Sequence, residues 1–294
     1  MPQSLPRVTP AVPLTPRPAT GVVFQDRLFT LICVLSGLMG ISILGFILFS
    51  LVAHGWHAMT FSMFTHRTLP NDLNGGLGNA ILGSLLMVSI SMLISIPIGV
   101  GAAVYLTQYQ SKGRLNKLIR FCNDSLLSTP SIAIGLFIFS IFVKPFHQFS
   151  AVAGSMALAL ISLPMIFRTT EDMLYLVSPL LNESALALGV PSYKVINRIL
   201  LRCARSGIVT GALLALARIA GETAPLLFTS LSNDYYSIKL TGPMASLPVI
   251  IYQYAMSPYQ HWQALAWSGA LLVTLFILLA NLAARFFSSD RKRQ

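Results

Sequence analysis

The chain contains 294 residues, of which 54% are hydrophobic and only 10% are charged, and its formal net charge is +11. About a quarter of the residues in soluble globular domains are charged, so this composition excludes an ordinary soluble domain and indicates a membrane protein. A positive net charge can also indicate a nucleic-acid partner. Here the basic residues flank long apolar intervals, and membrane topology explains them without nucleic acid.

Six intervals are long and apolar enough to hold a membrane-spanning helix, which needs about 20 residues. In chain order, we expect these spans near residues 28–53, 79–107, 125–143, 150–167, 207–231 and 263–286. The sequence therefore predicts an all-α, polytopic membrane protein with six transmembrane helices. Its membrane domain would cover residues 25–287, between a proline-rich, disordered cytoplasmic tail over residues 1–24 and a short cytoplasmic tail over residues 288–294.

The basic residues also predict the orientation of the chain. With the N-terminus in the cytoplasm, 16 of the 20 lysines and arginines fall in inside segments, three fall in outside segments and one lies within a span. This asymmetry is the one that the positive-inside rule describes. It predicts a multi-pass protein of the inner (plasma) membrane with both termini in the cytoplasm.

Prolines and small residues fall within two of these spans. Pro97 and Gly99-Val-Gly101 lie in the second span, and Ser128-Thr129-Pro130-Ser131 lies near the start of the third. In membrane helices such residues serve as hinges or as points of close helix packing. We interpret each of them as a packing point.

A long cytoplasmic loop is expected between the fourth and fifth spans, over residues 170–206. Asn182 can cap a short helix over residues 183–188, and Gly189 can end that helix in a left-handed turn. Pro191 then suits the first turn of a second helix, in which a basic stripe lies beside an apolar face. We expect this second helix to lie along the inner membrane surface, as a connector or as a docking element for a cytoplasmic partner. The stripe consists of Lys194, Arg198, Arg202 and Arg205.

Seven positions in this loop follow a recognisable spacing. They are Glu183, Ser184, Ala185, Gly189, Ile199, Leu201 and Arg202. The spacing resembles the EAA loop of ABC importer permeases, which runs Glu-Ala-Ala, three residues, Gly, nine residues, Ile, one residue, Leu-Pro; the serine and the arginine are the two departures. The resemblance implies a type I importer permease (MetI-like) fold. It also implies a coupling helix, held by the glutamate, the second alanine and the glycine, that docks in a groove of a separate ATPase subunit.

The chain itself has no Gly-x-x-x-x-Gly-Lys-Ser/Thr phosphate-binding loop. We therefore expect it not to hydrolyse ATP, not to be an enzyme and to hold no cofactor, and the resemblance implies two separate ATP-binding subunits. His54 and His57 could share a helix face, but two imidazoles without a third ligand do not predict a metal site.

The fifth span contains two charged residues, Arg218 and Glu222, in an otherwise apolar stretch. An i,i+4 spacing would place them on one helix face, about 6 Å apart along the axis. Charges at membrane depth cost at least about 2.5–3.5 kcal/mol each, so they usually face a protein interior or a water-filled path. The pair therefore predicts a transport pathway, and its flanking Gly221 and Pro225 could let the helix bend. The alternative is a buried ion pair that fixes helix packing.

The segment around this pair carries a second resemblance. Residues 217–229, Ala-Arg-Ile-Ala-Gly-Glu-Thr-Ala-Pro-Leu-Leu-Phe-Thr, are similar to the A-type permease subunit of phosphate-specific (Pst) importers, as are residues 74–81 and 130–136. The resemblance implies a bacterial subunit that moves inorganic phosphate by alternating access. Its implied partners are a homologous C-type permease, two ATP-binding subunits and a periplasmic or extracellular phosphate-binding protein, with lipid around the spans.

Under this resemblance, Arg218 would bind two phosphate oxygens through its planar donors, and Glu222 would hold its rotamer. Thr223 is assigned to the same substrate pathway. Arg168, at the inner end of the fourth span, is a candidate exit contact, although we favour a snorkelling residue at the span's flank.

Three other functions stay open from the sequence. The chain could be a permease for another oxyanion, or a proton-coupled secondary anion transporter that uses the intramembrane acid and base. It could also be an assembly or sensor subunit that transports nothing.

Overall fold

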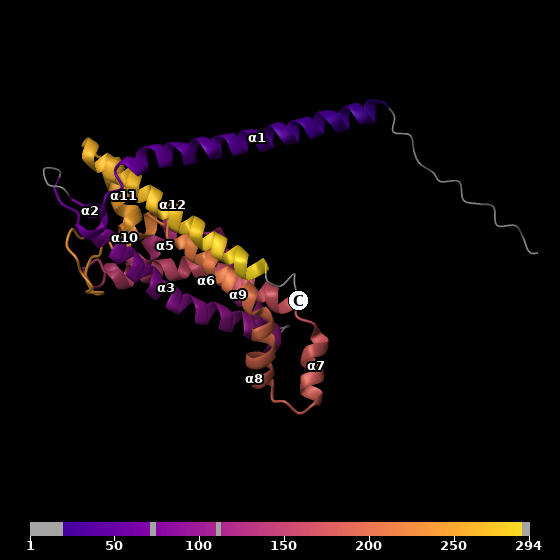
Figure 1. The fold of residues 1–294 in the computed structure, drawn as a ribbon. Helices are drawn as coiled ribbons and strands as arrows, with labels where there is room; N and C mark the ends of the chain where they lie inside the picture. Colours follow the sequence, from indigo (N-terminus) through magenta and orange to yellow (C-terminus); the bar gives the residue numbers. More distant parts are fainter. Residues whose placement is uncertain (1–19, 71–74, 110–112, 290–294) are drawn as a thin grey trace, which may run out of the picture. The chain divides into compact units, whose positions relative to one another are not determined.

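A computed structural model describes residues 20–70, 75–109 and 113–289 of the chain. Within these residues every regular element is a helix (Figure 1), so the all-α prediction is confirmed. The chain divides into two units, one ending at Ser50 and the other beginning at Leu51. Most of the predicted tail over residues 1–24 lies outside the described residues, as does most of the predicted C-terminal tail.

The first helix, α1 (Thr20–His57), contains the first predicted span and continues into the second unit. Its last turns pack there against the C-terminal helix: Ser268 Oγ donates a hydrogen bond to Gly55 O (3.1 Å), and His54 stacks on Trp267. The short helix α2 (Phe61–Thr65) follows.

The second unit is built around two long helices, α3 (Gly78–Val104) and α6 (Ala151–Tyr175). The two helices approach closely at Gly99, which has no side chain: a Cβ added there would lie 3.0 Å from Ile166 Cγ2. The interpretation of Gly99 as a packing point is therefore confirmed. That of Gly101 is wrong within the described residues, since a Cβ there would meet nothing within 4 Å. Pro97 lies within α3 without ending it. A π-helical turn, η1 (Tyr105–Tyr109), extends α3.

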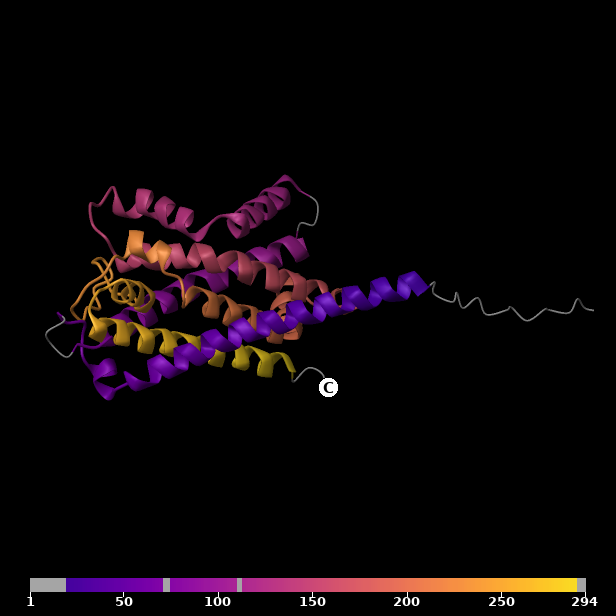
Figure 2. The same ribbon diagram turned by 90° about the horizontal axis from the view of Figure 1, so that it is seen from above.

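The third predicted span is broken. α4 (Arg114–Ser128) and α5 (Ser131–Ile138), which continues as the π-helical turn η2 (Phe139–Val143), are bent by 110° (Figure 2). The break falls at Thr129 and Pro130, because a proline disfavours helical backbone in the residue before it. The interpretation of this segment as a mere packing point is wrong, since one helix ends there and another begins.

Residues 192–219 form one continuous helix, which consists of α8 (Ser192–Val195), the π-helical turn η3 (Ile196–Leu200) and α9 (Leu201–Ile219). The prediction of a separate helix along the membrane surface is therefore wrong. The segment with the basic stripe extends the fifth long helix instead, and its Val195 and Leu200 are buried in one cluster with Phe167 and Leu174 of α6. Apolar packing against protein replaces the expected packing against lipid.

Four more helices complete the second unit: α7 (Pro179–Ala187), α10 (Ala224–Thr229), α11 (Leu247–Ala255) and α12 (Gln260–Ser289). α12 ends at the same end of this unit as α7 (Figure 1), and near its end Ala284 O accepts a hydrogen bond from Thr210 Oγ1 (3.3 Å). Among the described residues, five helices are long and apolar enough to cross a membrane. The bent pair of α4 and α5 makes a sixth if it counts as one span.

Candidate substrate site and coupling loop

Arg218, Glu222 and Thr223 lie where the fifth long helix breaks. α9 ends at Ile219 and α10 begins at Ala224, so Glu222 lies in the turn between two helices. The prediction that Arg218 and Glu222 share one helix face is therefore wrong. Pro225 favours the break, because in a continuous helix its ring would clash with the carbonyl of the residue four positions earlier.

Two close contacts show how deep this break lies. α9 runs antiparallel to α6, since Gly207 packs on Met173 and Gly211 packs on Thr169, each so closely that an added Cβ would clash. Arg218 follows Gly211 by about 10 Å along the helix axis, which places it beside the middle of the 25-residue α6. Non-helical backbone at membrane depth is tolerated where it is buried in protein or lines a water-filled cavity.

The break lies beside the bend between α4 and α5. A Cβ on Gly135 of α5 would lie 2.7 Å from Pro225 Cα, at the start of α10. Gly135 and Pro225 each follow their helix break by only a few residues, so the two interruptions lie within about two helical turns of each other. Adjoining helix breaks offer polar groups that can replace the hydration of an ion.

The side chains at the break are open rather than sealed. Arg218 is exposed on the surface of this chain, and Glu222 and Thr223 are half-buried. No carboxylate of the described residues, Glu222 included, lies within ion-pair distance of Arg218. The alternative of a buried ion pair is therefore not what the structure contains, and the guanidinium donors are available to another group.

The coupling-loop residues divide between α7 and the long helix that follows it. Glu183 and Ser184 are exposed on α7, whereas Ala185 is buried in the cluster that holds Val195. Gly189 has a φ of +79°, which is the predicted left-handed turn. The remaining members, Ile199 and Leu201, are half-buried on the long helix.

The start of α7 differs from the prediction. α7 begins at Pro179, after Ser178, and the Asn182 side chain donates to Gln108 Oε1 (3.5 Å) instead of capping the helix. Pro179 sets this start because its fixed backbone angle suits the first helical position.

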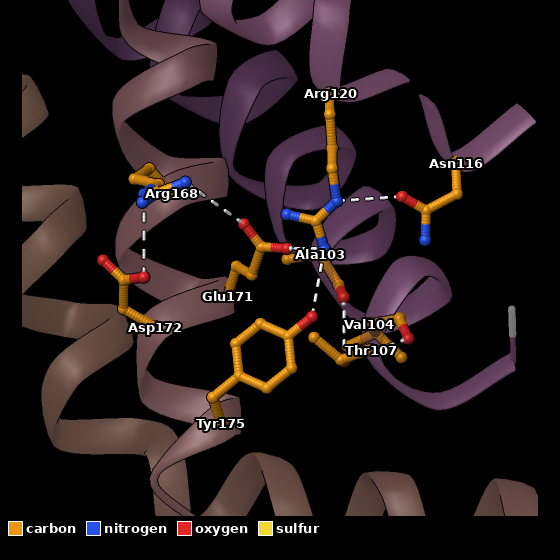
Figure 3. Close-up of polar contacts among 9 residues, drawn as sticks. All are labelled: Ala103, Val104, Thr107, Asn116, Arg120, Arg168, Glu171, Asp172 and Tyr175. Carbon is orange, nitrogen blue, oxygen red and sulfur yellow. Dashed lines mark hydrogen bonds and ion pairs between the residues drawn. The ribbon is translucent and has the colours of Figure 1, made fainter. Parts of the chain in front are cut away.

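Arg168 lies apart from the break, near the end of α6, in a cluster of charged side chains (Figure 3). Its Nη1 lies 3.8 Å from Glu171 Oε2 and its Nε lies 3.6 Å from Asp172 Oδ1. Arg120 of α4 reaches the same cluster, with its Nη2 2.5 Å from Glu171 Oε1. The Arg168 side chain is 55% exposed, as a residue at a helix flank would be.

Sequence reasoning missed Glu171 and Arg120. Glu171 is one of only three glutamates in the chain, and its side chain is 1% exposed. Its spacing from Arg168, one turn earlier beside the end of a span, was the available signal. Arg120 gave no such signal, because α4 meets α6 only in the folded chain.

Residues 95–293 match the family described as "Binding-protein-dependent transport system inner membrane component". The chain is 48% identical to the phosphate transport system permease protein PstA of Pasteurella multocida, over 92% of this chain and 96% of that protein. PstA of Haemophilus influenzae is 47% identical, over 91% and 95% of the two chains. PstA 1 of Mycobacterium tuberculosis is 39% identical, over 84% and 83%.

The chain belongs to the PstA family of transport permeases. Among solved structures, it is similar to the MetNI methionine ABC transporter in an inward-facing conformation, with a TM-score of 0.57 and 19% identity over 73% of this chain and 94% of that chain. An amino acid ABC transporter gives a TM-score of 0.51 at 14% identity, over 74% and 93%. At these identities the likeness concerns the fold alone, and it confirms the predicted MetI-like importer permease fold.

In the described ranges, no group of three or more His, Cys, Asp and Glu side chains could hold a metal ion.

Proposed function

We propose that this chain is the membrane-spanning permease subunit of an ATP-driven importer that moves inorganic phosphate across the bacterial inner membrane by alternating access. The names of its PstA relatives supply the substrate class. The structural observation that carries the proposal is the break between α9 and α10, where the exposed Arg218 guanidinium lies beside the middle of α6 and forms no ion pair with the residues that the structure describes.

The chemistry of this break suits a phosphate ion. A guanidinium can donate two parallel hydrogen bonds to two phosphate oxygens. The attraction between the positive guanidinium and the negative phosphate is stronger away from bulk water. The Thr223 hydroxyl, in the same turn, is a further donor. The Glu222 carboxylate repels the anion, so the site holds phosphate briefly and releases it when the conformation changes.

The exposure of Arg218 implies that another subunit covers it. A charge facing lipid at this depth costs at least about 2.5–3.5 kcal/mol, so we expect the face around the break to meet a C-type permease across the substrate pathway. We expect α7, which carries Glu183 and Ser184, to dock on one of two ATP-binding subunits. A phosphate-binding protein would meet the opposite end of the permease.

The same arrangement supports the proposed orientation. The C-terminal end of α12 lies at the end of the second unit where α7 lies, and α7 must face the cytoplasm to meet an ATPase. The excess of lysine and arginine in the predicted inside segments points the same way. Both termini would then be cytoplasmic.

The test is phosphate uptake by the assembled complex in proteoliposomes. Arg218→Gln should abolish uptake while the subunits still co-purify in normal amounts. Arg285→Gln, which removes an exposed arginine near the end of α12, is the matched control and should transport normally. Normal uptake by Arg218→Gln would refute the assigned role of Arg218.

The chief rival is a proton-coupled secondary transporter, because the acidic Glu222 and the basic Arg218 belong to the same break. A secondary transporter needs no ATPase, so this alternative does not explain the coupling loop on α7. Uptake that persists without ATP and stops when the proton gradient is dissipated would favour the rival. Competition by sulfate or molybdate at low concentration would favour a permease for another oxyanion.

A further inference from the structure

A buried acidic residue lies at the end of α6, away from the proposed phosphate site. Glu171 is 1% exposed, and an uncompensated carboxylate in such a position would be strongly disfavoured. Two arginines compensate it, with Arg120 Nη2 2.5 Å from Oε1 and Arg168 Nη1 3.8 Å from Oε2. The contact with Arg120 is the shorter of the two and joins two oppositely charged groups.

The Arg120 side chain links α4 to the last turns of α6 through polar contacts (Figure 3). Besides its contact with Glu171, its Nη2 donates a hydrogen bond to Tyr175 Oη (3.0 Å), one turn farther along α6. Its Nε donates to Asn116 Oδ1 (2.8 Å), one turn earlier on α4, and this asparagine is itself buried. The guanidinium is therefore held in one orientation between two helices that lie far apart in the sequence.

The contacts of Arg120 with α6 lie between the coupling loop and the proposed phosphate site. α7 begins four residues after Tyr175, the last residue of α6. On the other side, α4 leads across its bend into α5, where Gly135 packs on Pro225 at the start of α10. A continuous chain of contacts thus runs from α7 through α6, the Arg120 contact, α4 and α5 to the break that carries Arg218.

We propose that the Arg120–Glu171 ion pair transmits movement of the coupling loop to the substrate site. The inference rests on the proposed function, because it assumes that an ATPase moves α7. The end of α6 moves with α7, the ion pair moves α4, and α5 carries the movement to the break. Separating Arg120 from Glu171 would remove the shorter of the two ion pairs that compensate this buried carboxylate, so the helices move together rather than past each other. Arg120 and Glu171 are positioning residues and do not touch phosphate.

A purely structural brace would behave differently. If the pair only stabilised the fold, its loss would lower the amount of assembled complex, and transport and ATP hydrolysis would fall in the same proportion. A transmitting contact instead predicts that the complex assembles and hydrolyses ATP while moving less phosphate for each ATP. The ratio of phosphate moved to ATP hydrolysed therefore separates the two roles.

The first experiment measures this ratio in proteoliposomes with the phosphate-binding protein present. In Glu171→Gln, we expect the ratio to fall about tenfold, while the yield of complex and the basal ATPase rate stay unchanged. Asp172→Asn is the matched control, because it removes the neighbouring carboxylate, which is 55% exposed. An unchanged ratio in Glu171→Gln, or a loss of transport that only follows the yield of complex, would overturn the inference.

A double substitution tests whether the two residues act through one contact. Arg120→Gln should lower the ratio as Glu171→Gln does, and the variant with both changes should be no worse than either alone. Losses that multiply in the double variant would show independent roles and would also overturn the inference.

The second experiment does not depend on phosphate. With Cys33, Cys122 and Cys203 replaced by serine, Leu188→Cys reports docking beside α7 and Phe137→Cys reports movement of α5, since both positions are exposed. ATP should change the maleimide labelling rate at both positions, and in Glu171→Gln only at Leu188→Cys. An ATP response at Phe137→Cys that survives Glu171→Gln contradicts the inference. If the unsubstituted complex moves no phosphate, the proposed function fails, and the labelling still decides the role of the ion pair.

Discussion

One added methyl group can test the contact between α5 and α10. In Gly135→Ala, the new Cβ would lie 2.7 Å from Pro225 Cα, whereas an ordinary contact begins at 3.4 Å. The nearest atom belongs to the backbone and cannot rotate away, so α5 and α10 must separate by about 0.7 Å. Overpacking of this kind costs about 1–3 kcal/mol, which exceeds the gain of about 0.8–1 kcal/mol that alanine brings to a helix over glycine.

The assay compares this variant with Gly101→Ala, a glycine in α3 whose Cβ would meet nothing within 4 Å. We expect Gly101→Ala to leave the melting temperature of the purified complex unchanged or to raise it. Gly135→Ala should lower the melting temperature and should also reduce phosphate uptake at equal amounts of complex, because the break at Arg218 shifts with α10. Equal melting temperatures and equal uptake for the two variants would refute the reasoning about this contact.

Three further changes have distinct expected outcomes. Gly189→Ala places a Cβ at a φ of +79°, which costs about 1–2 kcal/mol, so less ATPase subunit should co-purify with the permease. Arg218→Lys keeps the charge but loses the paired donors, so uptake assays should show a raised KM with residual transport, in contrast to Arg218→Gln. Asn79→Leu removes the hydrogen bonds to Thr68 N (3.0 Å) and Asn233 O (2.8 Å) and costs about 1–3 kcal/mol. Its melting temperature should fall while the phosphate moved per ATP stays constant.

The helices were predictable because a bilayer forces each backbone polar group to be bonded within its own helix. Apolar intervals therefore located the long helices, but they did not locate the helix ends. α6 runs to Tyr175, eight residues past its predicted span, and the fifth long helix begins at Ser192 instead of residue 207. Hydropathy marks only the part of a helix that lies in lipid, and both extensions are held by apolar packing against other helices of the protein.

The break that carries Arg218 was only partly predictable. Gly221 and Pro225 marked a bend, but prolines also lie inside intact helices of this chain, as Pro97 in α3 and Pro164 in α6 do. What distinguishes the break is the packing of α10 on α5, between segments that are distant in the sequence. The contact of Arg120 with Glu171 has the same character, and no local pattern records either of them.

The chain uses arginine and glutamate twice, in opposite arrangements. Arg120 pairs with Glu171 and donates hydrogen bonds to Tyr175 and Asn116, so binding a passing anion would cost it the closest charge contact of a buried carboxylate. If α9 continued past Glu222, Arg218 and Glu222 could form an ion pair as Arg120 and Glu171 do, because residues four apart on a helix are neighbours. Because α9 ends at Ile219, Glu222 leaves the helix face that carries Arg218, and the two side chains do not form an ion pair. The helix break therefore does more than expose an arginine beside the middle of α6, since no carboxylate of the described residues then pairs with the donors that we propose bind phosphate.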